Sequence, residues 1–245
     1  MPIVDDEDER EGTSCLAIAH EMIAGVPCIV ARPSGGTPAP GALVVLDGTR
    51  VLRRVDRLVA EGRLDPACLP VMVGIDPDPA DRGLAQYTPW LHPAYKPGAA
   101  DFGGRAEAFL ADTVLPVAEA LRREHSEGPI GLFGYSLAGL FSLFAMLNTD
   151  VFSTYLLASP STWYPGIVNR VARMPLACDP RVVVACGANE GLDHPEPSAG
   201  IRQDTDRLVA CLSERLTRRP VVVIDELDHH RGLAVRLQTL LERWG

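Results

Sequence analysis

Short apolar runs alternate with longer amphipathic segments along most of the chain. Eight runs have the length and the β-branched content of strands, at 15–22, 26–32, 42–46, 69–75, 130–133, 154–158, 182–186 and 221–224. Six segments between them carry apolar residues at three- and four-residue spacing, as amphipathic helices do, at 51–61, 106–124, 137–147, 161–172, 202–215 and 233–244. A short turn at Ala24-Gly25 joins the first two runs, which predicts an antiparallel opening pair. The alternation of strand and helix that follows predicts an α/β fold with a mostly parallel, eight-stranded sheet flanked by helices.

Composition and charge limit the domain organisation and the classes of partner that are expected for the chain. The chain has 245 residues, of which 47% are apolar, enough to bury the core of one α/β domain over 1–245; the acidic stretch 1–12 is expected to be a flexible N-terminus. The net charge is −9 and no basic block is present, which argues against nucleic acid as a partner. No apolar stretch reaches the roughly 18 to 20 residues of a spanning helix, and 1–6 do not resemble a signal peptide, so no membrane association and a cytoplasmic location are expected.

The six cysteines are scattered and mostly lie inside apolar runs. None is spaced as C-x-x-C, so buried free thiols are expected rather than disulfides or a zinc site. No metal site is therefore predicted from the cysteines, and no cofactor is expected. The sequence does not indicate an oligomeric state.

A candidate nucleophile follows the run 130–133. The sequence Gly134-Tyr135-Ser136-Leu137-Ala138-Gly139 lies between that predicted strand and the helical pattern 137–147, which is the context that the G-x-S-x-G nucleophile elbow requires. Small neighbours are needed because the serine occupies a strained turn, and Ala138 takes the place of the second glycine. The alternative is a serine that caps a helix after a tight turn.

The acid and the histidine of such a site are expected later in the chain, each after a strand. Glu190 follows the run 182–186, and His229 and His230 follow the last predicted strand, directly before the last helix. Taken singly, Glu190 fits a solvated loop carboxylate and either histidine fits a surface or capping residue. Their order and their positions at strand ends favour a catalytic set with Ser136.

An oxyanion hole would need two backbone N–H groups. Leu137, directly after the serine, would supply one. The second is expected from the turn after the run 42–46, where Thr49 is the first choice and Gly48 the next; a simple β-turn is the alternative. The long stretch 76–104 is irregular and rich in aromatics, and we expect it to fold over the site and line the substrate pocket through Trp90. Tyr135 and Trp163 are further candidates for that pocket, where rings could stack on a planar acyl group.

Several sequence blocks in a fixed order resemble the esterases related to esterase D, and within them the ferri-enterobactin (enterochelin) esterase-like branch. The resemblance runs from about Gly41 to the C-terminus. Its carriers, besides the serine elbow, are Leu46-Asp47-Gly48, the stretch 57–62 before Val73-Gly74-Ile75-Asp76, Tyr87-Thr88-Pro89-Trp90, the stretch 102–110 and Ala158-Ser159-Pro160-Ser161-Thr162-Trp163-Tyr164.

The resemblance implies a three-layer α/β-hydrolase that holds no metal and hydrolyses esters or, in one branch, the lactone bonds of catecholate siderophores. It implies Ser136 as nucleophile, Thr49 and Leu137 as oxyanion donors and Glu190 as acid, although some relatives work as a Ser-His dyad. The chain departs from the family in reading His229-His230-Arg231-Gly232 at the histidine. Neither an export segment nor the additional N-terminal domain of the cytoplasmic enterobactin esterases is expected from its sequence.

The choice between the two histidines rests on this resemblance. Counting from His229 places Leu237 and Leu241 at the apolar positions of the family's last helix, and Asp228-His229 repeats its acidic-residue-then-histidine order. Counting from His230 places Arg236 six residues on, as in the enterobactin-esterase branch. We select His229 as the general base and expect His230 at the rim of the site.

The leading hypothesis is a serine esterase that acts on a small-molecule carboxylic ester or lactone. An acyltransferase or a thioesterase would use the same three side chains with a different acceptor. From another class, a catalytically silent α/β-hydrolase could act as a binding module, because a fold does not guarantee its function.

Overall fold

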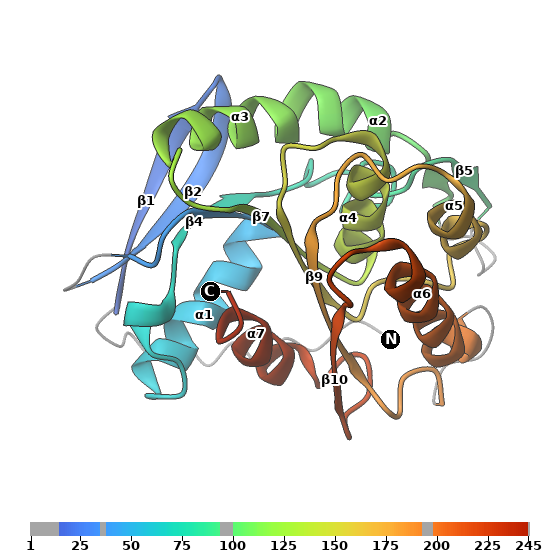
Figure 1. The fold of residues 1–245 in the computed structure, drawn as a ribbon. Coiled ribbons are helices and arrows are strands. Elements are labelled where there is room, and N and C mark those ends of the chain that lie inside the picture. Colours follow the sequence, from blue (N-terminus) through green and yellow to red (C-terminus); the bar gives the residue numbers. More distant parts are fainter. Residues whose placement is uncertain (1–14, 35–37, 94–99, 193–197, 245) are drawn as a thin grey trace.

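A computed structural model describes residues 15–34, 38–93, 100–192 and 198–244. The acidic stretch 1–12 lies outside these residues. At the centre is one sheet of eight strands, in which only the first two pairings, β1 with β2 and β2 with β4, are antiparallel (Figure 1). In spatial order the strands are β1 (Leu16–Ile23), β2 (Val26–Pro33), β4 (Val71–Ile75), β3 (Ala42–Leu46), β7 (Ile130–Tyr135), β8 (Thr154–Ala158), β9 (Arg181–Gly187) and β10 (Val221–Asp225).

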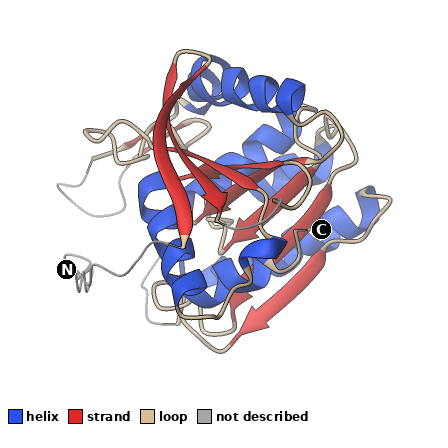
Figure 2. Ribbon diagram, turned by 90° about the vertical axis from the view of Figure 1, so that its left-hand side faces the viewer, coloured by secondary structure: helices blue, strands red, loops and turns tan. Residues whose placement is uncertain are grey.

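Helices cover both faces of this sheet and complete a three-layer architecture (Figure 2). Because successive side chains of a strand point to opposite faces, Leu132 and Phe133 of β7 belong to two different apolar clusters. One cluster packs under α3 (Leu115–Glu124), α4 (Leu137–Asn148), α5 (Ile167–Arg173) and α6 (Ile201–Arg215), and the other packs under α1 (Gly48–Ala60) and α7 (Leu233–Leu241). The predicted fold class is confirmed.

The opening pair is a hairpin, as the sequence predicts. Leu16 lies opposite Pro33 and Ile23 opposite Val26, and the turn residues Ala24 and Gly25 both have positive φ (49° and 82°). Positive φ at both central residues is the signature of a type I′ turn, whose twist matches that of the paired strands.

Two predicted helices have different limits in the structure. The segment 106–124 is α2 (Ala106–Phe109), a π-helical stretch (Leu110–Val114) and α3, because Pro116 lacks an N–H and its ring cannot fit against a regular preceding turn. The segment 161–172 becomes helical only at Ile167, since Pro165 precedes a Gly166 with φ of 86°.

The stretch 76–104 is not wholly irregular. Its described residues include a separate two-stranded antiparallel sheet, β5 (Leu91–His92) with β6 (Phe102–Gly103), whereas 94–99 lie outside the described residues. Two 3₁₀ turns complete the elements, Pro66–Cys68 and Ser198–Gly200.

All six cysteines are free thiols, with Cys28 and Cys186 buried and Cys68 exposed. In the described part of the chain, no helix is both long and apolar enough to cross a membrane.

Candidate active site

Ser136 lies at the turn between β7 and α4, at the carboxyl edge of the sheet. Its φ of 57° and ψ of −117° are unusual for a residue with a side chain, and its N–H donates to the Ala158 carbonyl at 3.1 Å. The neighbours must be small: a Cβ at Gly134 would overlap the Ala138 carbonyl oxygen, and one at Gly139 would lie 2.8 Å from the Cα of Pro160. The turn therefore presents a partly exposed hydroxyl above a closely packed strand and helix.

His229 reaches this hydroxyl from the histidine loop, the residues 226–232 between β10 and α7. Its Nε2 lies 2.9 Å from Oγ of Ser136, and its Nδ1 lies 3.1 Å from Oε2 of Glu190. Because a carboxylate can only accept, Nδ1 carries the proton and Nε2 is left to accept from the serine. This is the tautomer that a general base needs.

Glu190 lies in the acid loop, the residues 188–192 that follow β9. It is 3% exposed, and its Oε1 accepts from the Ser159 hydroxyl at 2.6 Å and from the Gly187 N–H at 2.7 Å. Burial raises the pKa of Glu190, but the hydrogen bonds from His229, Ser159 and Gly187 outweigh burial and hold that pKa below its ordinary value. The carboxyl group therefore stays ionised beside the imidazole.

Tyr135 supports the imidazole and is itself buried. Its ring stacks on His229 with centroids 5.2 Å apart, and its hydroxyl donates to the His229 carbonyl at 2.8 Å. Burial raises the pKa of Tyr135 to about 12, so the phenol keeps its proton at neutral pH. His230 is exposed and packs edge-on against His229, with centroids 5.3 Å apart.

The two regions predicted to supply oxyanion donors differ in what their amides already contact. Leu137 follows Ser136 at the first position of α4. In the turn after β3, the Thr49 N–H donates to Asp76 at 3.0 Å and the Asp47 N–H to the Tyr87 hydroxyl at 3.2 Å. Within the described residues no acceptor is found for the N–H of Gly48. A donor already bonded to a carboxylate must break that bond before it can bind another anion, so of these two amides that of Gly48 is the more available.

Trp90 and Trp163 belong to one aromatic cluster. Both rings contact Tyr164, at centroid distances of 5.6 and 5.9 Å, and the Tyr164 hydroxyl donates to the Trp90 carbonyl. The same segment carries Ser161, whose hydroxyl lies 3.5 Å from that of Ser136. The cluster is thus joined to the candidate nucleophile through the residues after β8.

Three residues that contact Glu190 or one another beside the candidate catalytic residues were not predicted from the sequence to act in the site: Ser159, Asp225 and Arg236. Ser159 has a positive φ of 44°, which no sequence pattern announces. Arg236 did leave a signal: it lies on the apolar stripe of the last helix, between Leu233 and Leu240, where a charged residue is unusual.

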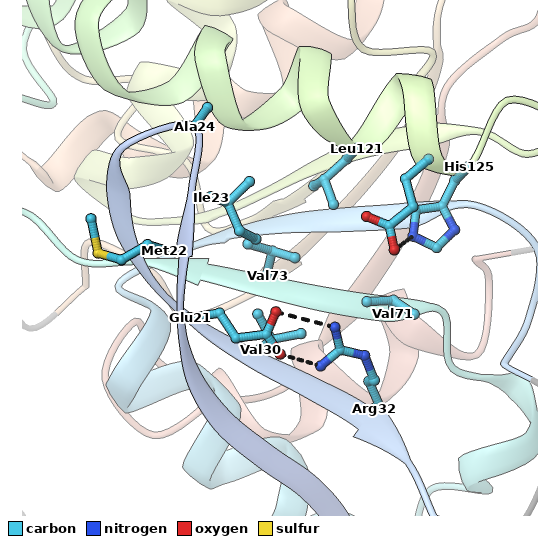
Figure 3. A pocket seen from close by; sticks show the side chains of 11 residues that line it. Glu21, Met22, Ile23, Ala24, Val30, Arg32, Val71, Val73, Leu121 and His125 are labelled. Carbon is cyan, nitrogen blue, oxygen red and sulfur yellow. Dashed lines mark hydrogen bonds and ion pairs between the residues drawn. The ribbon is translucent and has the colours of Figure 1, made fainter.

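A cavity of about 320 Å³ lies elsewhere, between the β1–β2 hairpin and α3 (Figure 3). The ion pair of Arg32 with Glu21 and the side chain of His125 form its polar wall, and Val71 and Val73 lie on its floor. None of the predicted site residues lines it. This cavity does not belong to the candidate active site.

The strand order and the positions of the candidate catalytic residues define the structural class of the protein. Strand order 1-2-4-3-7-8-9-10, with a serine elbow after β7 and an acid and a histidine after β9 and β10, is that of an α/β-hydrolase.

Comparisons then give the family. Residues 27–189 match the model of the family described as "Putative esterase", and the chain belongs to this family, whose chemistry is ester hydrolysis. No curated protein sequence matches the chain.

Solved structures share the fold. They include an IroE-like serine hydrolase from Shewanella oneidensis (18% identity, TM-score 0.72, covering 93% of this chain and 79% of that one). A second is the siderophore hydrolase EstA from Aspergillus nidulans (20% identity, TM-score 0.62, covering 94% of this chain and 94% of that one). A third is the enterobactin hydrolase IroE in complex with DFP (22% identity, TM-score 0.64, covering 95% of this chain and 96% of that one).

Proposed function

We propose that the protein is a serine esterase in which Ser136 is the nucleophile, His229 the general base and Glu190 the acid that orients it. The observation that carries this proposal is the continuous hydrogen-bonded path from the Ser136 hydroxyl through both nitrogens of His229 to Glu190, at 2.9 and 3.1 Å. Family membership supports the same chemistry.

The proposed reaction runs through an acyl-enzyme. His229 Nε2 takes the hydroxyl proton as Oγ of Ser136 bonds to the ester carbonyl carbon, and the carbonyl oxygen gains the charge. The N–H of Leu137, and that of Gly48 or Thr49, would stabilise this oxyanion. The imidazolium returns the proton to the departing alcohol, and a water molecule then repeats the sequence to release the acid.

The substrate class that we propose is an aryl or siderophore-type ester or lactone. Stacking surface is available near the site in the cluster of Trp90, Trp163 and Tyr164. Neighbours of the same fold are described as siderophore and enterobactin hydrolases, which supports testing this class first.

The test combines a fluorophosphonate probe with a substrate panel of p-nitrophenyl esters, aryl esters, acyl thioesters and a catecholate trilactone. The wild type should be labelled on the peptide that contains Ser136 and should hydrolyse aryl esters. Ser136→Ala should lose several orders of magnitude in kcat and should not be labelled. Because no step of the proposed reaction uses a metal ion, EDTA should leave the activity unchanged.

A matched control is Ser213→Ala, since the Ser213 hydroxyl donates to the Val209 carbonyl of its own helix, α6. It should react with the probe as the wild type does. Turnover by Ser136→Ala would refute the assignment of the nucleophile, thioester-only turnover would indicate a thioesterase, and a wild type that neither turns over nor takes the label would indicate a binding module.

A further inference from the structure

Arg236 lies beneath the array of Ser136, His229 and Glu190 with none of its side chain exposed. It is on the first turns of α7, and helical side chains lean toward the helix N-terminus, so its guanidinium reaches the histidine loop that precedes the helix. Nε and Nη2 form a fork with the two carboxylate oxygens of Asp225, at 2.8 and 3.0 Å. Asp225 is the last residue of β10, so the guanidinium is fixed to the end of that strand.

The remaining donors of this guanidinium contact both loops that supply the candidate catalytic groups. On the acid-loop side, Nη1 lies 3.0 Å from Oε1 of Glu190 and 2.7 Å from Oγ of Ser159. On the histidine-loop side, Nη1 lies 3.2 Å from the carbonyl oxygen of His229, and Nη2 lies 2.9 Å from that of Asp228. One planar group therefore bridges the acid loop and the histidine loop.

Two glycines make the space that the guanidinium occupies. A Cβ at Gly232 would overlap Cζ of Arg236, and one at Gly187 would overlap first the carbonyl oxygen of Leu227 and then Nη2 of Arg236. Gly232 has φ of −82° and ψ of −9°, a conformation open to any residue, so its lack of a side chain serves the space and not the backbone. The missing side chain at Gly232 leaves space for the arginine, and the one at Gly187 leaves space for the Leu227 backbone and the arginine together.

The charged groups around Arg236 fit a proton transfer from Ser136 to His229. The guanidinium of Arg236 pairs with two carboxylates, Asp225 in the fork and Glu190 at 3.0 Å, so one of the two negative charges remains for the imidazolium. Oε1 of Glu190 is held by Ser159, Gly187 and Arg236, so that Oε2 faces Nδ1 of His229. A carboxylate held on one side in this way cannot rotate away when the imidazole becomes charged.

We propose that Arg236 is a positioning residue for this active site: it holds the Glu190 carboxylate and the His229 backbone in the one arrangement in which Oε2 and Nδ1 meet. This rests on the proposed function of Ser136, His229 and Glu190. Buried ion pairs contribute little net stability compared with apolar residues of similar size, so a purely stabilising role would not require an arginine on the apolar stripe of α7.

The test measures kcat and KM of Arg236→Met, Arg236→Lys and Gly232→Ala on the best ester of the panel, after circular dichroism has shown the native fold. Lysine keeps the charge but cannot form the fork, and Gly232→Ala keeps the arginine but displaces its guanidinium. Each variant should lose about 100-fold in kcat, the usual effect of displacing a catalytic group by about 1 Å, with KM changed by only a few-fold. Arg202→Met is the control: Arg202 is another arginine near β9, but its guanidinium contacts Cys186 and Asp206 and not the three candidate catalytic residues, so both constants should be unchanged.

A second measurement separates positioning from structure. Because Arg236 is proposed to hold both Glu190 and the backbone of His229, Arg236→Met should cost little more in the His229→Ala background, where no imidazole is left to position. The full loss in that background would overturn the proposal. Gly232→Ala that folds and keeps wild-type kcat would also overturn it. Inactive wild type, or active Ser136→Ala, would instead refute the proposed function, so the two failures are distinguishable.

Discussion

His229 and His230 are adjacent, yet their rings have different surroundings. Only His229 contacts both Ser136 and Glu190, while His230 is exposed and touches the first ring edge-on. His229→Ala should therefore lose as much kcat as Ser136→Ala, because the serine would have no proton acceptor. His230→Ala should keep most of the activity. Steady-state kinetics of the two variants checks this, and the reverse pattern would move the general base one residue along.

The carboxylates of Glu190 and Asp228 also differ in the groups that they contact. Glu190 faces Nδ1, whereas Asp228 accepts from the backbone N–H of Arg231 at 2.8 Å and so shapes the histidine loop. Glu190→Gln should lower kcat by about 10⁴-fold, less than Ser136→Ala does, because an amide cannot stabilise the imidazolium. Asp228→Asn should stay within a few-fold of wild type. Near-normal kcat in Glu190→Gln would indicate a Ser-His dyad; Asp193, a further carboxylate worth testing, lies outside the described residues.

The geometry of a parallel sheet explains which of these residues could be predicted from the sequence. Ser136, Glu190 and His229 could be picked out because each follows a strand, and the carboxyl ends of parallel strands converge on one edge. Arg236 and Ser159 lie far apart along the chain and on different elements, so their contact depends on side-chain packing that no periodicity encodes. The engagement of the Thr49 amide by Asp76 was hidden for the same reason.

At the scale of elements, predicted limits fail where a local feature interrupts the pattern. Apolar spacing continues through 106–124, but Pro116 converts its middle into a π-helical stretch. Spacing also continues through 161–172, yet the first six residues form the turn that places Ser161 beside Ser136. The segment after β8 thus has a role in the site that overrides its helical pattern.

The stretch 76–104 and the turn after β8 are held together by Trp90 and Tyr164, and Arg170 of α5 lies over the Trp90 ring at 4.5 Å from its centroid. If this stretch lines the substrate pocket, Trp90→Ala should raise KM for aryl esters more than for alkyl esters, because a stacking surface is lost. Trp244→Ala is the contrast: Trp244 is buried against the opposite face of the sheet, so its loss should lower Tm and leave KM unchanged. Unchanged aryl-ester KM in Trp90→Ala would show that the stretch does not line the pocket.

At the scale of the whole molecule, the candidate site depends on the sheet as one unit. Its residues follow β3, β7, β8, β9 and β10, so separating any of these strands would dismantle it. One apolar cluster lies on each face of this sheet. The two clusters share its strands, since neighbouring residues of each central strand belong to different clusters. We propose on this ground that 1–245 is a single domain.

A single domain should unfold in one cooperative step, and the tryptophans allow each face to be followed separately. Trp244 packs in the cluster under α1 and α7, while Trp90 and Trp163 pack against the other cluster. In urea, Trp244→Phe reports fluorescence from the Trp90–Trp163 face alone, and the double variant Trp90→Phe/Trp163→Phe reports from the Trp244 face alone. Within each variant, the fluorescence midpoint should coincide with the midpoints from far-UV circular dichroism and from loss of ester hydrolysis, because neither face can keep its cluster once the shared strands separate. Comparing probes within one protein removes the change in stability that each substitution brings. A fluorescence midpoint on one face that departs from the circular dichroism midpoint would mean that the chain folds as two units.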